Sequence, residues 1–134
     1  MKKLLNIISF ALLITLVSFC ASDDSLLENK WQLRKYVHTD GIVQSEDSVF
    51  YNFMKESFSA ICLLSDGSYT TIFGNYSLNG DELMIKILPE STSGPAYERY
   101  INWKDGVRVF KIEELSSSVL QLNYNGEKSV FRKY

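Results

Sequence analysis

Apolar and polar residues alternate along most of the chain beyond residue 29. In segment 30–37, Trp31 and Leu33 share one face while Gln32 and Arg34 share the other. A period of two is typical of a half-buried β-strand. Similar runs recur at intervals of roughly eight to fourteen residues, and helical periodicity is almost absent. The pattern predicts an all-β domain.

Turn signals separate these runs. Asp40-Gly41, Asn79-Gly80 and Asn125-Gly126 suit the positive backbone angles of tight turns. Gly74 suggests a bulge or bend inside a strand. Residues 89–95, which contain two prolines and a glycine, form the one long loop. The expected strands are 30–37, 48–54, 57–64, 69–78 with its bend at Gly74, 83–87, 96–103, 107–113, 120–124 and 129–133.

A meander of this many antiparallel strands leaves unpaired edges unless the sheet closes on itself. Closure of about eight strands gives an interior that side chains fill or that holds one small ligand. We therefore expect an up-and-down β-barrel, with a β-sandwich as the alternative architecture.

The N-terminus predicts export. Lys2 and Lys3 precede a mostly apolar segment, 4–17, which is shorter than the ~20 residues of a membrane-spanning helix. This pattern is typical of a secretory signal peptide, here residues 1–19. Residues 17–20, Val-Ser-Phe-Cys, resemble the lipobox of bacterial lipoproteins, which implies lipidation of Cys20. The alternative is an ordinary signal peptide cut near Ala21.

The residues after Cys20 suggest a destination. Ser22, Asp23 and Asp24 resemble the export signal that places Bacteroidota lipoproteins on the outer face of the outer membrane. The resemblance implies attachment through acyl chains on Cys20 and a surface-facing protein, with a periplasmic location as the alternative. We expect residues 20–28 to form a flexible tether before a domain at 29–134.

Charge and composition exclude several functions. The formal net charge is −2, so the basic footprint of a nucleic-acid-binding protein is absent. One histidine and two cysteines are too few for a zinc site or most catalytic triads. His38 lies near Asp40 but has no recognisable nucleophile to activate. We expect no catalytic residues, no metal, no cofactor and no enzyme activity.

A family resemblance follows from several motifs. Asn29-Lys30-Trp31 opens the first strand, segment 47–53 (Asp-Ser-Val-Phe-Tyr-Asn-Phe) lies in the early hairpin, and Phe131-Arg132-Lys133 ends the last strand. With segment 74–83, they resemble small lipocalin-like domains of Bacteroidota lipoproteins. The resemblance implies a calycin-type barrel from about Leu27 to Tyr134. It also implies that Arg132 packs across Trp31 to close the barrel.

The aromatic residues suggest a ligand site. Eight Phe, eight Tyr and two Trp provide either a wall for a small apolar or glycan-derived ligand or the filling of a solid barrel. A solid barrel would favour a structural or interaction module, with unknown protein partners. The inward, ligand-lining candidates are Leu33, Phe53, Phe58, Tyr76, Leu83, Ile85, Phe110, Ile112, Leu120 and Leu122.

Two serines match a modification motif. Asp24-Ser25-Leu26 and Asp47-Ser48-Val49 resemble the triplet used for O-glycosylation of exported proteins in Bacteroidota. Ser25 and Ser48 are therefore candidate glycosylation sites.

Overall fold

The computed structural model describes residues 23–134. Predictions for the signal peptide, Cys20 and Ser22 lie outside this range. The helical elements are α2 (Asp23–Leu27), η1 (Pro89–Ser91), α3 (Pro95–Tyr100) and η2 (Lys104–Gly106). The strands are β1 (Lys30–Val37), β2 (Val43–Ser45), β3 (Val49–Met54), β4 (Ser57–Leu63), β5 (Tyr69–Asn79), β6 (Glu82–Ile87), β7 (Val107–Leu115), β8 (Val119–Tyr124) and β9 (Glu127–Lys133).

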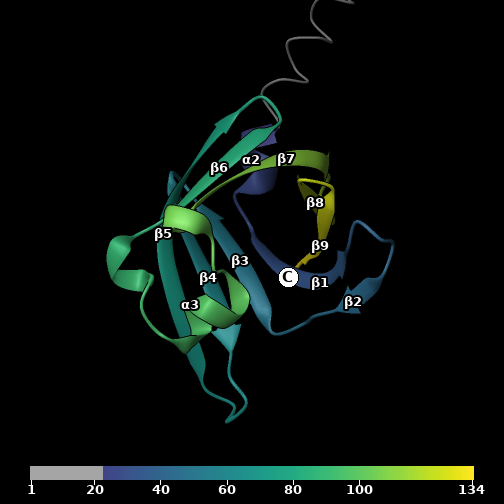
Figure 1. Cartoon of the computed structure of the whole chain (residues 1–134). Helices are drawn as coiled ribbons and strands as arrows, with labels where there is room; N and C mark the ends of the chain where they lie inside the picture. The colour runs from purple at the N-terminus through teal and green to yellow at the C-terminus, as the bar shows by residue number, and fades with distance from the viewer. Residues whose placement is uncertain (1–22) are drawn as a thin grey trace, which may run out of the picture.

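Eight of these strands form a closed antiparallel barrel (Figure 1). Each strand from β3 to β9 pairs with its sequence neighbour, β3 pairs with the first half of β1, and β9 pairs back onto β1. The short β2 adds to Lys35–Val37 beside the barrel. The predicted all-β, up-and-down barrel is confirmed.

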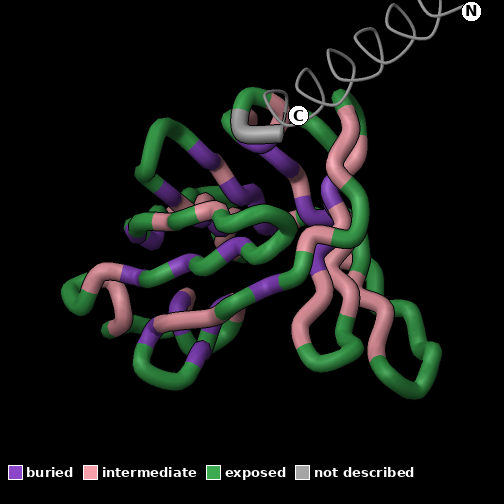
Figure 2. Tube along the Cα trace, turned by 90° about the horizontal axis from the view of Figure 1, so that it is seen from above, coloured by how far each residue is buried: buried purple, intermediate pink, exposed green. Residues whose placement is uncertain are grey.

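Side-chain alternation produces the core. Buried and exposed residues alternate along β6, whose Leu83, Ile85 and Ile87 are buried while the residues between them face solvent. The same alternation is visible along many strands in Figure 2. Burial of apolar surface contributes about 25 cal/mol per Å², so this pattern fixes which face of each strand points inward.

The segment 96–103 is not the strand we predicted. It contains α3, η2 begins just after it, and Tyr97 and Ile101 are buried. Their spacing of four residues matches a helical face. Pro95 occupies the first turn, where its fixed φ favours helix initiation. Helical spacing over one turn was mistaken for strand alternation.

No bulge occurs at Gly74, because β5 runs unbroken from Tyr69 to Asn79 and its pairing with β4 and β6 has no register shift there. Gly74 is needed for a different reason. A Cβ atom at this position would lie 2.5 Å from the carbonyl oxygen of Lys86 on β6. The glycine therefore permits close packing of two neighbouring strands.

Helices lie at opposite ends of the barrel (Figure 1). At one end, Leu27 of α2 is fully buried, and its carbonyl accepts a 3.0 Å hydrogen bond from Trp31 Nε1. The predicted flexible tether at residues 20–28 is therefore wrong from Asp23 onward, because α2 is helical and docked. At the other end, the segment from η1 to η2 places Tyr97, Ile101 and Trp103 against the core.

Candidate functional site

Arg108 brings a positive charge to the inner face of the barrel at the α3 end. It lies opposite Ile85 in the β6–β7 ladder, one inward position before Phe110 and Leu83. Strand alternation therefore gives Arg108 the same face as the buried core residues. Its side chain is half-buried.

Aromatic rings surround the Arg108 guanidinium. Its central carbon lies 3.9 Å from the ring centroid of Tyr124, 5.3 Å from Trp103 and 5.9 Å from Phe110. Such cation–π contacts contribute about 0.5–2 kcal/mol each, more as the site is desolvated. Within residues 23–134, however, Arg108 has no carboxylate partner and donates no hydrogen bond.

Two tyrosines of the barrel interior interact electrostatically with this charge. Tyr36 and Tyr51 point inward from β1 and β3, and no group in the described part of the chain bonds either hydroxyl. Burial raises the pKa of Tyr36 to about 12, and the charge of Glu46 adds to the rise, while Arg108 opposes it. Burial also raises the pKa of Tyr51, and the charge of Arg108 again acts to lower it. Both tyrosines therefore remain protonated at neutral pH.

Solvent reaches the hydroxyl of Tyr51. The residue is only 6% exposed, and its ring packs against Phe58 and Phe131 at centroid distances of 5.0 and 4.8 Å. Every fully enclosed polar side-chain atom of residues 23–134 has a hydrogen-bond partner. The Tyr51 hydroxyl has no such partner, so it is not fully enclosed, and the 6% of Tyr51 that is exposed must include the hydroxyl oxygen.

We call Tyr36, Tyr51, Trp103, Arg108 and Tyr124 the arginine cluster. Cys62 borders it, since its thiol acts electrostatically on both Tyr36 and Tyr51. Burial raises the pKa of the Cys62 thiol to about 11, so it is uncharged at neutral pH. Its sulfur therefore contributes an apolar surface rather than a nucleophile.

The rim beside the cluster contains the single histidine of the chain. His38 Nδ1 lies 2.6 Å from Glu127 Oε1, and Nε2 lies 3.0 Å from Gln44 Oε1. The hydrogen bond to Glu127 is the main cause of a raised His38 pKa. Asp40 instead accepts a bond from the Ile42 amide, so the His38–Asp40 pair considered from the sequence does not form.

A short helical segment covers part of the arginine cluster. The Tyr97 hydroxyl donates a 2.7 Å hydrogen bond to the carbonyl of Trp103, which also accepts from the Gly106 amide at 3.0 Å. These two bonds hold the backbone that places the Trp103 indole over Arg108. Tyr100 reaches towards the Leu63 carbonyl across the barrel mouth.

Most predicted ligand-lining residues belong to a solid core. Their exposed fractions of 0–1% leave no space beside them even for a water molecule, so the prediction that they line a cavity is wrong. The barrel is filled at this depth because aromatic and branched side chains meet from all sides. These core residues are Leu33, Phe53, Phe58, Leu83, Ile85, Leu120 and Leu122.

The other three candidates lie at borders. Phe110 is 4% exposed and touches the arginine cluster. Tyr76 and Ile112 are half-buried at the α2 end, where they border separate surface hollows of about 570 and 200 Å³.

The predicted contact between Arg132 and Trp31 is wrong. Arg132 lies opposite Gln32 in the β1–β9 ladder and bonds its side-chain oxygen at 3.4 Å. Gln32 and Arg132 face outward, whereas Trp31 faces inward and is fully buried. Successive residues point to opposite faces of a strand, and Phe131 takes the inward position of β9. Barrel closure here depends on Trp31, Leu27 and Phe131.

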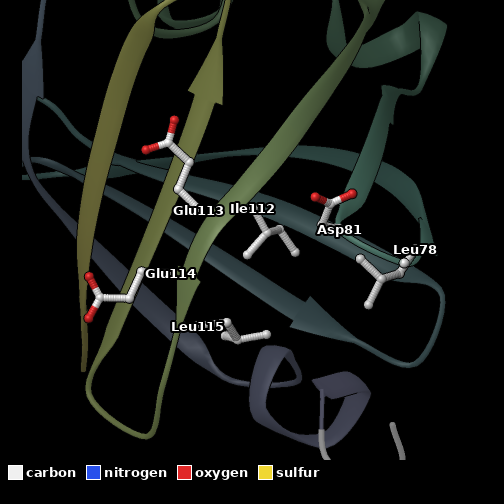
Figure 3. A pocket seen from close by; sticks show the side chains of 7 residues that line it. Leu78, Asp81, Ile112, Glu113, Glu114 and Leu115 are labelled. Carbon is white, nitrogen blue, oxygen red and sulfur yellow. The ribbon is translucent and has the colours of Figure 1, made fainter.

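The acidic residues of β7 do not form a catalytic pair. Figure 3 shows a hollow of about 200 Å³ with Leu78, Ile112 and Leu115 directed into it, while the carboxylate of Glu114 points away. Glu113 accepts hydrogen bonds from Gln121 and Asn123 and an ion pair from Lys128. The hollow is thus a surface feature of mixed apolar and acidic lining.

The remaining predicted sites lie at the N-terminus and on loops. Asp23, Asp24 and Ser25 are part of α2, and Ser25 is exposed. Ser48 is half-buried, and Glu46 accepts a hydrogen bond from its amide. Within residues 23–134, no three His, Cys, Asp or Glu side chains gather as metal ligands. No helix in that range has the length and apolarity needed to cross a membrane.

Arg108 was not identified from the sequence as a residue of the barrel interior, although the strand alternation indicated it. Phe110 and Ile112 were assigned inward, and the same alternation places Arg108 inward. Tyr36 could not be found this way, since the ladder shifts register between Leu33 and Lys35. That irregularity moves Tyr36 onto the inner face.

Comparisons with known proteins agree with this architecture. The family model described as a lipocalin-like domain matches residues 14–134. A lipocalin-like protein from Bacteroides uniformis is 56% identical, with a TM-score of 0.80, covering 81% of this chain and 99% of its own. An uncharacterized protein from Bacteroides eggerthii is 43% identical, with a TM-score of 0.73 and coverages of 79% and 98%. A search of curated proteins finds no match.

Proposed function

This chain belongs to the lipocalin-like domain family, and from that premise we propose that it binds a small molecule at the α3 end of its barrel. The observation that supports this function is the arginine cluster. It contains two tyrosine hydroxyls without a hydrogen-bond partner among residues 23–134 and a guanidinium without an acidic partner there, whereas the buried residues of the barrel interior are apolar. Ligand sites are mostly apolar with a few convergent polar groups.

The site suits a small ligand rather than a long chain. The core beneath the tyrosines is solid, so a ligand occupies the mouth of the barrel and not its length. The covering residue Trp103 and the wall residue Tyr124 provide apolar contact, and the tyrosine hydroxyls orient the polar end.

Binding is tested by thermal denaturation of the full chain carrying Cys20→Ala with a library of small charged and neutral compounds. A ligand at a hundred times its Kd stabilises the native state by about 2.7 kcal/mol. We expect stabilising compounds to lose their effect in Trp103→Ala, while the exposed-site control Tyr69→Ala keeps it. Compounds that stabilise both variants equally would place the binding elsewhere.

We further propose that acyl chains on Cys20 anchor the protein to the outer membrane, facing the cell surface. Support comes from the lipobox-like residues 17–20 and from the Ser22-Asp23-Asp24 segment. Each buried methylene contributes about 0.8 kcal/mol to such an anchor. In the native host, Cys20→Ala is expected to move the protein out of the membrane fraction. Protection from protease added to intact cells would favour the periplasmic face.

The anchor gives the barrel an orientation. Cys20 is three residues before Asp23, a span of at most about 10 Å, and α2 is docked at the barrel end opposite α3. The arginine cluster would then face away from the membrane. We expect labelled lipids to quench a fluorophore attached at Lys55, at the α2 end. The same lipids should not quench a fluorophore attached at Asn125, next to Tyr124 of the arginine cluster.

A second candidate function is a structural or interaction module without a ligand. The solid core favours it, and so does the exposed apolar pair Ile42 and Val43, 61% and 56% exposed at the start of the edge strand β2. Failure of every library compound to stabilise the chain would favour this alternative.

A further inference from the structure

The chemistry of the arginine cluster defines the charge of its ligand. A cation withdrawn from water is costly unless an opposite charge or hydrogen-bond acceptors compensate it. Arg108 is half-buried, and within residues 23–134 its guanidinium has three aromatic-ring contacts but neither an ion pair nor a hydrogen bond. Its planar fork of N–H donors matches the two oxygens of a carboxylate.

The neighbouring groups are also donors. The hydroxyls of Tyr36 and Tyr51 stay protonated, and neither has an acceptor among the described residues. A guanidinium can donate to both oxygens of one anionic group, and a tyrosine hydroxyl is a further donor of the same kind. Hydrogen bonds of this charge-assisted kind are roughly twice as strong as neutral ones.

Acidic residues at the rim limit the charge of that anion. Glu46 acts electrostatically on Tyr36 and Cys62, and Glu127 acts on Tyr36. The Glu46 carboxylate is held in place by the amides of Asp47 and Ser48. Glu127 is already paired with His38, so Glu46 is the carboxylate that would repel a doubly charged phosphate, whereas a single charge is matched by Arg108 alone.

Resting on the proposed function, we propose that the ligand is a small organic carboxylate with a planar or apolar body. Its carboxylate would bind Arg108 and the hydroxyls of Tyr36 and Tyr51. Its body would lie against Trp103 and Tyr124.

Matched pairs of probes test this proposal: benzoate and benzamide, phenylacetate and phenylacetamide, octanoate and octanamide. Each is titrated into the full chain carrying Cys20→Ala, with binding followed by NMR at the arginine side-chain resonances. We expect at least one carboxylate to bind about tenfold more tightly than its amide, and phenyl phosphate to bind more weakly than phenylacetate.

Two variants assign the effect to Arg108. Arg108→Gln should remove the preference for the carboxylate, whereas Arg99→Gln should keep it. The Arg99→Gln variant removes the same charge as Arg108→Gln. Arg99 also lies over an aromatic ring, that of Tyr100 at 5.0 Å, but it is exposed on α3. If Arg108→Gln does not fold, Tyr36→Phe and Tyr51→Phe, which each remove one hydroxyl, should weaken carboxylate binding without affecting amide binding.

The outcomes separate the two proposals. Amides that bind at the arginine cluster as tightly as carboxylates would overturn the carboxylate class and leave the binding function intact. A preference for phenyl phosphate would also overturn it. If no probe shifts the Arg108 side-chain resonances although library compounds bind at Trp103, the proposal of a carboxylate ligand is wrong and the proposal of small-molecule binding stands.

Discussion

Trp31 links the first strand to the helix that closes one end of the barrel. Its indole is fully buried and donates to the Leu27 carbonyl at 3.0 Å. Removing a large core side chain typically costs about 3–5 kcal/mol, and the lost hydrogen bond leaves the carbonyl of Leu27 with the Asn29 amide, at 2.6 Å, as its donor. Trp31 is therefore a structural residue.

Trp31→Ala is expected to lower the free energy of unfolding by about 3–5 kcal/mol in urea denaturation. Arg132→Ala is the control, since the Arg132 side chain is exposed, and we expect a change within about 0.5 kcal/mol. A loss well above about 0.5 kcal/mol in Arg132→Ala would contradict this account and support the packing of Arg132 across Trp31 that the sequence suggested.

The His38–Glu127 pair makes stability depend on pH. The hydrogen bond to Glu127 raises the His38 pKa above its ordinary value of 6.5, and Gln44 and the charge of Asp40 act in the same direction. Protonated His38 donates to both oxygen partners. The stabilisation is therefore complete below pH 6.5 and is lost as the pH rises through the higher pKa of the folded state.

Glu127→Gln should be less stable than the wild type at pH 5.5, and the gap should shrink as the pH rises past the folded pKa of His38. The check is a set of urea denaturation curves at several pH values, with Glu90→Gln as an exposed control. A gap that widens with increasing pH would contradict this assignment.

At the scale of elements, the segment from η1 to η2 positions Trp103 in the arginine cluster. The Tyr97 hydroxyl bonds the Trp103 carbonyl at 2.7 Å, whereas the Tyr100 hydroxyl is 3.5 Å from the Leu63 carbonyl. A buried hydrogen bond contributes about 1 kcal/mol, and an orphaned buried partner costs more. The first bond therefore matters more for the placement of Trp103.

Tyr97→Phe should destabilise the chain by about 1–2 kcal/mol and accelerate amide hydrogen exchange of Gly106, whose amide bonds the same carbonyl. Tyr100→Phe removes the longer bond and should change both quantities much less. Equal exchange rates at Gly106 in the two variants would show that the backbone around the Trp103 carbonyl is held without the Tyr97 hydroxyl.

At the scale of the whole molecule, strand alternation and turn residues were sufficient to predict the barrel. Lys30–Val37 was placed correctly because Trp31 and Leu33 alternate with polar residues. The α3 segment was missed, since a single helical turn spans too few residues to separate a period of 3.6 from a period of two. The three-residue β2 was missed for the same reason, being too short to show a pattern.

The arginine cluster and its rim were less predictable than the fold. His38 and Glu127 are 89 residues apart in the chain, and the register shift that turns Tyr36 inward depends on the pairing of β1 with β9. Such contacts arise from barrel closure and leave no local pattern. Arg108 was the exception, since alternation with Phe110 already placed a charge on the inner face.

The two tryptophans allow the central claim to be tested in one measurement. Trp31 lies at the α2 end, and Trp103 lies over the arginine cluster at the α3 end. With 5-fluorotryptophan incorporated, the full chain should give two ¹⁹F NMR signals, assigned by Trp103→Phe. Compounds that raise the Tm should shift the Trp103 signal and leave that of Trp31 in place. A shift confined to Trp31, or no shift of either signal with a stabilising compound, would contradict binding at the α3 end of the barrel.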